Sequence, residues 1–258
     1  MARNVATARS AAAARTSIAL PSSLLFEPTT SDTVNCGNKT CFNMTAAFTL
    51  ECWVNPDIIT GNLEIIAKRA GVGGPANYNI ETSSANFSIY YNNGTWYGAT
   101  TTGNPLVVGT WTHIAGSWDG TYLRAYVNGV LNKTSADLSA TPPTTNTTAV
   151  QISGFPSQSY FDGYIAEVRI WNKALNVNDL LNHTNNPSSV STANSAGVTY
   201  ANCVAHYKFL EGTGTTTKDR SQFNNQGIFT GSGKPAWNSS IPTGLTSRVI
   251  GNARSAVA

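Results

Sequence analysis

The sequence has few charged residues and little from which a metal or redox centre could be built. Asp, Glu, Lys and Arg make up 11% of its 258 residues, well below the roughly 25% of a typical globular domain. The four cysteines have no CxxC spacing and only three histidines occur, so we expect no zinc site. Cys36 and Cys41 could close a small disulfide loop in an oxidising compartment, but spacing alone leaves the pairing of Cys36, Cys41, Cys52 and Cys203 open.

Long apolar runs are also missing. No stretch reaches the length of a membrane-spanning helix, so we expect no membrane span. Near the N-terminus, Ala11–Ala14 is too short and too weakly apolar for the core of a secretory signal peptide, and Arg15 follows it directly.

Acidic residues are absent from both ends of the chain. Residues 1–26 carry Arg3, Arg9 and Arg15, and residues 220–258 carry Arg220, Lys234, Arg248 and Arg254. The segment between them holds nine bases against thirteen acids. This contrast predicts basic arms that dock on other protein subunits, with Arg3, Arg9, Arg15, Arg248 and Arg254 as the assembly residues. The positive charge is too sparse to indicate nucleic acid as a partner.

The most informative stretch is Trp111–Leu131, which predicts an antiparallel meander. Asn128-Gly129 between alternating apolar residues is a strong hairpin signal, since a type I′ turn needs positive φ at both positions. Within Tyr122–Val127, one face carries Leu123, Ala125 and Val127, and the other carries tyrosines and Arg124.

The rest of the pattern is also mostly β. Further strands are expected at 23–26, 47–56, 62–69, 78–82, 86–91, 95–101, 150–153, 160–171, 203–209 and 226–229. Only Leu175–Thr184 predicts a helix, with Asn176 as its N-cap and Leu180 and Leu181 facing inward. Many short strands separated by turns indicate an all-β fold of two stacked antiparallel sheets.

Three ordered blocks, FTLECWVNP, WTHIAGSWDGTYLRAYVNGVL and YFDGYIAEVRIWNKAL, resemble the laminin-G-like, concanavalin A-like lectin/glucanase superfamily. The resemblance implies a two-sheet jelly-roll sandwich, and members mostly bind glycans or proteins, some with calcium at a rim. The expected division is a basic N-terminal arm at 1–21, a jelly roll at 22–237 that residues 203–237 complete, and a basic tail at 238–258.

The same fold hosts glucanases, but the acids here do not follow their pattern. Retaining hydrolysis needs two carboxyl groups about 5–5.5 Å apart. Asp162 and Glu167 are five residues apart and would point to opposite faces of a continuous strand, and Glu51 is alone on its strand. His113, His183 and His206 lie near no nucleophile-elbow motif. We therefore expect no enzymatic activity.

Two kinds of binding site remain. Tyr90, Tyr91, Asn93, Trp96 and Tyr97 surround a predicted turn and could form a glycan platform, unless alternate members point into the core. Asp162, Asp219 and Asn224, with Asn225 beside them, are the candidate ligands for calcium, although such residues also serve as ordinary turn residues. No cofactor is required.

Together these features predict a non-enzymatic structural subunit of a large surface assembly, such as a virion coat, decoration or fibre or an extracellular filament. Arm contacts would hold the subunits together. The alternative is a free carbohydrate-binding adhesin, with or without calcium. Either function places the protein on a virion surface or outside the cell.

Overall fold

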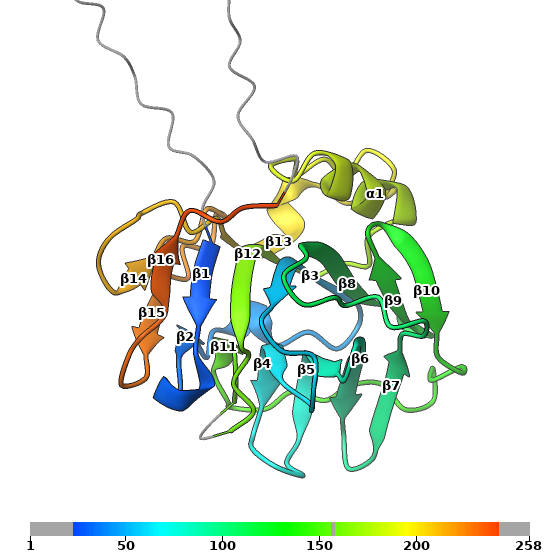
Figure 1. The fold of residues 1–258 in the computed structure, drawn as a ribbon. Helices are drawn as coiled ribbons and strands as arrows, with labels where there is room; N and C mark the ends of the chain where they lie inside the picture. The colour runs from blue at the N-terminus through cyan, green and yellow to red at the C-terminus, as the bar shows by residue number, and fades with distance from the viewer. Residues whose placement is uncertain (1–22, 156–157, 243–258) are drawn as a thin grey trace, which may run out of the picture.

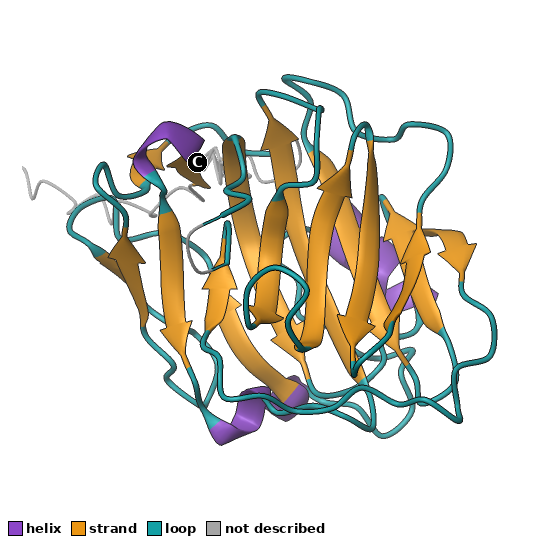
Figure 2. Ribbon diagram, turned by 90° about the horizontal axis from the view of Figure 1, so that it is seen from below, coloured by secondary structure: helices purple, strands orange, loops and turns teal. Residues whose placement is uncertain are grey.

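The computed structural model describes residues 23–155 and 158–242. These residues form two antiparallel eight-stranded sheets, A and B, stacked as a sandwich (Figure 1). Seen from below, the strand axes of the two sheets are nearly aligned, with neighbouring arrows pointing in opposite directions and loops at both ends of the strands (Figure 2). The predicted all-β, two-sheet jelly-roll class is confirmed.

Sheet A has the strand order β10-β9-β8-β3-β12-β1-β16, and β13 also pairs with β12. Its strands are β1 (Ser23–Phe26), β3 (Phe48–Pro56), β8 (Thr112–Trp118), β9 (Leu123–Val127), β10 (Val130–Thr134), β12 (Gly163–Trp171), β13 (Cys203–Tyr207) and β16 (Ala236–Asn238).

Sheet B has the order β14-β15-β2-β11-β4-β5-β6-β7. Its strands are β2 (Thr33–Gly37), β4 (Glu64–Arg69), β5 (Ala76–Ser83), β6 (Asn86–Asn92), β7 (Trp96–Thr100), β11 (Val150–Ile152), β14 (Thr216–Thr217) and β15 (Gly227–Thr230). Short 3₁₀ turns occur at Pro28–Thr30, Thr40–Phe42 and Tyr200–Asn202.

The main core lies between the sheets and follows the alternation of the sequence. On β3, Phe48, Leu50, Cys52 and Val54 all point into it and are fully buried. In the meander, Leu123 and Ala125 join the same core, and Asn128 and Gly129 have φ values of 48° and 74°. These are the positive values that the hairpin pattern requires.

A second layer covers the outer face of sheet A. The helix α1 (Val177–Asn185) begins at Asn176, whose side chain accepts a hydrogen bond from the backbone N–H of Asn178. Leu180 is fully buried in a cluster with Tyr126 and Trp171, whereas Leu181 is 39% exposed. The expectation that both leucines face inward was wrong, because adjacent helical residues point in directions about 100° apart.

A bulge in β12 changes which residues share a face. Glu167 has a φ of 49°, and the pairing with β3 shifts register between Ala166 and Arg169. Ile165 therefore points into the core with Val168 and Ile170. The strand expected at residues 160–171 is therefore not continuous, because a bulge inserts an extra residue into it.

The segment after α1 returns to both sheets. β13 pairs with the C-terminal half of β12, β15 pairs with β2, and β16 pairs with β1.

All four cysteines are free thiols. The disulfide considered between Cys36 and Cys41 is therefore not formed in this structure.

Candidate functional site

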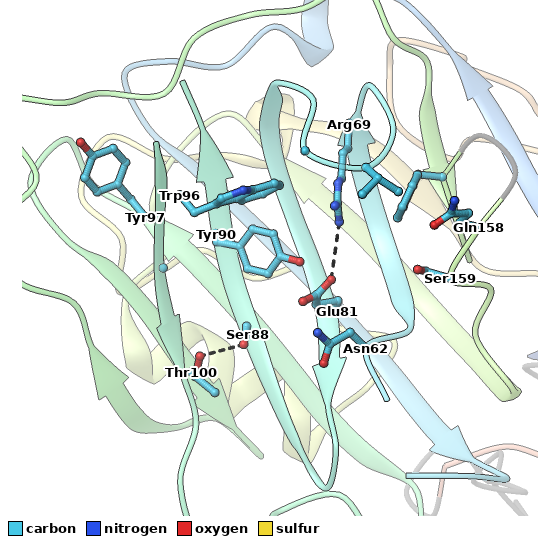
Figure 3. Close-up of a pocket in the computed structure, with 14 residues that line it drawn as sticks. Asn62, Arg69, Glu81, Ser88, Tyr90, Trp96, Tyr97, Thr100, Gln158 and Ser159 are labelled. Carbon is cyan, nitrogen blue, oxygen red and sulfur yellow. Dashed lines mark hydrogen bonds and ion pairs between the residues drawn. The ribbon is translucent and has the colours of Figure 1, made fainter. Parts of the chain in front are cut away.

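A pocket crosses the outer face of sheet B, over β4, β5, β6 and β7. It is an open groove with a volume of about 630 Å³. Figure 3 shows its side chains, with Trp96 and Tyr90 on one side, Arg69 and Glu81 in the middle, and Gln158 and Ser159 opposite.

Two aromatic rings form one wall of the groove. Trp96 from β7 is 42% exposed, and its ring meets that of Tyr90 from β6 at 5.1 Å in an edge-to-face arrangement. Gly98 is the cross-strand partner of Tyr90, and a Cβ on it would lie 2.9 Å from the Cβ of Tyr90. The missing side chain leaves open space between Trp96 and Thr100.

The guanidinium group of Arg69 packs against this wall. Its guanidinium carbon lies 4.8 Å from the centre of the Trp96 ring and 4.2 Å from that of Phe155, so both aromatic rings stack against it. Its Nη1 forms an ion pair with Glu64 and lies 3.6 Å from Glu81, and its Nε donates to the carbonyl of Gly71 at 3.2 Å.

Glu64 and Glu81 are cross-strand partners on β4 and β5. Glu64 is fully buried and accepts a hydrogen bond from Nδ2 of Asn79 at 3.0 Å. Burial, together with the charge of Glu81, raises the pKa of Glu64 to about 8. Glu81 lines the groove, so it is the carboxyl group that a ligand can reach.

This carboxyl pair was not predicted from the sequence, because its two members lie on different strands and have no spacing in common along the chain. Its geometry differs from that of a hydrolytic pair. Both carboxyl groups of a glycosidase must flank the bond that is cleaved. Here only Glu81 faces the groove, while Glu64 is enclosed by Arg69 and Asn79. The pair fixes Arg69 against the aromatic wall.

Polar groups complete the groove. Ser88 and Thr100 are hydrogen bonded to each other through their hydroxyls at 2.8 Å, and Asn62, Gln158 and Ser159 lie along the other side. Hydroxyl and amide groups of this kind both donate and accept hydrogen bonds. The site therefore combines an exposed aromatic surface with several hydrogen-bonding partners.

Of the five residues predicted as a glycan platform, the structure brings Tyr90 and Trp96 together in the groove. Tyr91 lies fully buried in the core, where its hydroxyl donates to the carbonyl of Thr141 at 2.7 Å, so its inclusion is corrected. Tyr97 lines the edge of the groove, but its ring packs against the main core, 5.5 Å from the ring of Tyr91. Asn93 donates to the carbonyl oxygens of Thr141 and Pro142. Alternation along the strands explains the split.

The candidate calcium ligands do not converge. Asp219 accepts four hydrogen bonds of 2.7–2.8 Å from the backbone N–H groups of His206, Ser221 and Asn225 and from the Ser221 hydroxyl. Asn224 is a turn residue with a φ of 51°. Partial burial and the charges of Asp57 and Glu27 raise the pKa of Asp162. Within residues 23–155 and 158–242, no three His, Cys, Asp or Glu side chains are grouped to hold a metal ion.

All three histidines lie in a buried polar network beneath α1 and the loop that follows it. Glu51 accepts from Trp171 Nε1 at 2.8 Å, and the rings of His183 and His113 lie 3.0 and 3.1 Å from it. Arg169 links Glu51 to Glu167, whose Oε2 is 2.9 Å from Nε2 of His206. This network was missed because its members are far apart in sequence. His113 and Glu51 nevertheless lie on the adjacent strands β8 and β3, where Glu51 is paired with Ala115 and His113 with Trp53.

The assembly residues Arg3, Arg9, Arg15, Arg248 and Arg254 lie outside the described residues. In the part of the chain that is described, no helix is long and apolar enough to cross a membrane.

The stacked antiparallel sheets and the groove across one of them define a jelly-roll sandwich of the lectin type. The chain belongs to the concanavalin A-like lectin/glucanases superfamily, whose family model matches residues 28–180. The resemblance seen in the three sequence blocks is thereby confirmed. A comparison with curated protein sequences gives no match.

Solved structures with similar folds include a candidate carbohydrate binding protein from Bacteroides ovatus. It shares 21% identity at a TM-score of 0.61, over 86% of this chain and 60% of that one. The present chain thus spans three fifths of that protein. A domain of an extracellular arabinanase from Geobacillus stearothermophilus, solved with arabinotriose, shares 21% identity at a TM-score of 0.43, over 55% of this chain and 68% of that one. These likenesses concern the fold.

Proposed function

We propose that the chain is a non-catalytic, extracellular or surface-exposed module that binds a glycan in the groove on sheet B. The observation that carries this proposal is the exposed Trp96 beside Glu81, Ser88 and Thr100 in one open groove. The Bacteroides ovatus protein with the same fold, described as a candidate carbohydrate binding protein, supports the proposal.

Each part of the groove matches a part of a sugar. A pyranose ring has an apolar face of C–H groups that stacks on an aromatic ring, and Trp96 offers such a ring. Sugar hydroxyls both donate and accept, and Ser88, Thr100 and the Glu81 carboxylate can satisfy them. The volume of about 630 Å³ lies within the usual range for small-ligand pockets.

The first prediction concerns Trp96. Trp96→Ala should weaken glycan binding by about 10–30-fold, because an exposed aromatic anchor commonly contributes 1.4–2 kcal/mol or more. The protein is first screened on a glycan array, and the strongest ligand is then titrated by calorimetry with and without EDTA. We propose that no metal is needed, so EDTA should leave the affinity unchanged.

The matched control is Trp111→Ala, the same change at a partly exposed tryptophan that does not line the groove. It should leave the affinity within about threefold of the wild type, provided that circular dichroism shows a folded protein. The proposal is contradicted if no glycan binds, or if both variants bind as well as the wild type.

Assembly is a second function, favoured by the charge contrast between the ends and the body. The basic residues at the ends face a body with nine bases and thirteen acids, so arms of one copy could dock on another copy. The edge strand β10 is exposed along its whole length, with Val130 62% and Leu131 45% exposed. Such an edge can also pair with another chain.

Removing residues 1–21 and 243–258 should convert an assembling protein into a monomer, as measured by size exclusion with light scattering. A full-length variant with Arg3, Arg9, Arg15, Arg248 and Arg254 all changed to Gln is the control for chain length, and it should also lose assembly because the attraction is electrostatic. If the truncated chain assembles as well as the full chain, arm-mediated assembly is refuted.

A further inference from the structure

We propose that the groove on sheet B selects uncharged glycans and discriminates against acidic ones, with Glu81 as the residue that sets this preference. The inference rests on the proposed function of the groove. It goes further by naming the chemical class of the ligand.

The groove has one cation, and that cation is already engaged. Among the described lining residues only Arg69 is basic, and its side chain is as exposed as that of Glu81, at 10% each. Its Nη1 pairs with Glu64, its Nε donates to Gly71, and aromatic rings stack against it. An anionic sugar needs a free guanidinium or ammonium group with its donors turned toward the ligand. Nε and Nη1 of Arg69 are occupied and leave only Nη2 for a ligand, and its positive charge is already offset by the carboxyl groups of Glu64 and Glu81.

The two carboxyl groups beside Arg69 offset its charge, so the groove carries no net positive charge. With Glu64 and Glu81 both ionised, the cluster around Arg69 carries one net negative charge. When Glu64 takes up a proton, the cluster is neutral. Neither state attracts a carboxylate or a sulfate, and the ionised Glu81 repels one at short range.

The nearest other basic side chain of β4 does not change this balance. Lys68 points its ammonium group to oxygens of Asn38, Asn146 and Thr148, at 2.9, 3.1 and 2.6 Å. Those residues belong to loops that do not line the groove. The positive charge of Lys68 is therefore held elsewhere.

Glu81 favours neutral sugars for a second reason. An ionised carboxylate accepts two hydrogen bonds from neighbouring hydroxyls of one sugar ring, and such charge-assisted bonds are stronger than neutral ones. A uronic acid or sialic acid would place its own carboxylate against that of Glu81, and neither carboxylate can donate a hydrogen bond to the other. At the separations of a groove, a like charge costs enough to change an affinity by about tenfold or more.

The test uses matched pairs of probes in which a hydroxymethyl group is replaced by a carboxylate: oligogalactosides against oligogalacturonates, and oligomannosides against oligomannuronates. Calorimetry at pH 7.5 should give at least one neutral member that binds about tenfold more tightly than its acidic counterpart. Raising the salt concentration from 20 mM to 500 mM should narrow the gap, because it is electrostatic.

Glu81→Gln should reduce the difference within a pair to about threefold or less, while Glu27→Gln, the same change at an exposed acid outside the groove, should leave it intact. An acidic member that binds as tightly as its neutral counterpart, in a manner abolished by Trp96→Ala, overturns the selectivity and leaves the proposed function standing. If no member of any pair binds, the proposed function falls and the selectivity falls with it. The salt series on the wild type decides the question even if Glu81→Gln fails to fold.

Discussion

Replacing Glu51 with leucine should lower the free energy of unfolding by about 3–5 kcal/mol. Glu51 is fully buried and is the common acceptor for Trp171, His183 and His113. Leucine fills a similar volume but accepts nothing, so several polar groups would remain buried without a partner. Arg169 would also lose one of its two carboxylate neighbours.

Denaturant unfolding of the wild type and the variant measures this loss. Glu27→Leu is the matched control, because it makes the same chemical change at an exposed residue and should shift the unfolding free energy by no more than about 0.5 kcal/mol. A loss below about 1 kcal/mol in Glu51→Leu would show that the network contributes little to stability.

Acidification should destabilise the protein from about pH 6.5 downward, well before ordinary carboxylates titrate. Burial lowers the pKa of His206 from 6.5 to about 4, an effect that the neighbouring Glu167 only partly offsets and that Arg169 and Lys208 reinforce. Burial also lowers the pKa of His113. Between pH 6.5 and about pH 4, the unfolded chain binds a proton at His206 that the folded chain excludes. The free energy of unfolding therefore falls as the pH falls. His206 alone accounts for about 3 kcal/mol.

A second loss should follow at lower pH. Burial by itself would raise the pKa values of Glu51 and Glu167. His183 and Arg169 nevertheless hold the pKa of Glu51 well below 4.5, and Arg169 and His206 lower the pKa of Glu167. Carboxylates of this kind stabilise the fold above their unfolded pKa and lose that contribution as they are protonated.

Unfolding free energies measured from pH 7.5 to pH 4 test the histidine phase, with His206→Asn as the comparison. The asparagine variant cannot titrate, so its stability should depend less on pH by about 3 kcal/mol over this range, whatever its stability at pH 7.5. Equal slopes for the two proteins would refute the assignment.

Local patterns predicted the fold well. Alternation identified the buried face of β3, and Asn128-Gly129 identified the turn between β9 and β10. Asn176 was correctly predicted as the N-cap of α1. These signals succeed because they depend on neighbours in sequence and on one buried face per strand.

The groove was predicted only in part, for a physical reason. Tyr90 and Trp96 surround one hairpin, so sequence proximity revealed them. Arg69 and Glu81 come from two other strands, and their meeting depends on the register between β4 and β5. The sequence did carry one sign of this cluster: the segment EIIAKR on β4 has charged residues at both ends. Charged residues within a buried strand usually have partners, so these residues indicate an ion pair with another strand.

The histidine network could not be predicted from the sequence alone. The bulge at Glu167 places that residue near Arg169 and His206, and no turn residue in the sequence marks its position. His113, His183 and His206 meet only after β3, β8, β12, β13 and α1 have packed. Long-range convergence of this kind is a property of the tertiary structure.

The pairing of β1 with β16 places Ser23 directly opposite Asn238, and the Ser23 hydroxyl donates to the carbonyl of Ser240 at 2.6 Å. The polypeptide thus enters and leaves the body at one spot on sheet A, whereas the groove opens on sheet B. A dye or a surface linker attached at Ser23 or at Ser240 would therefore share a single anchoring point. The opposite side would stay free, so the protein could be immobilised with its groove facing the solution.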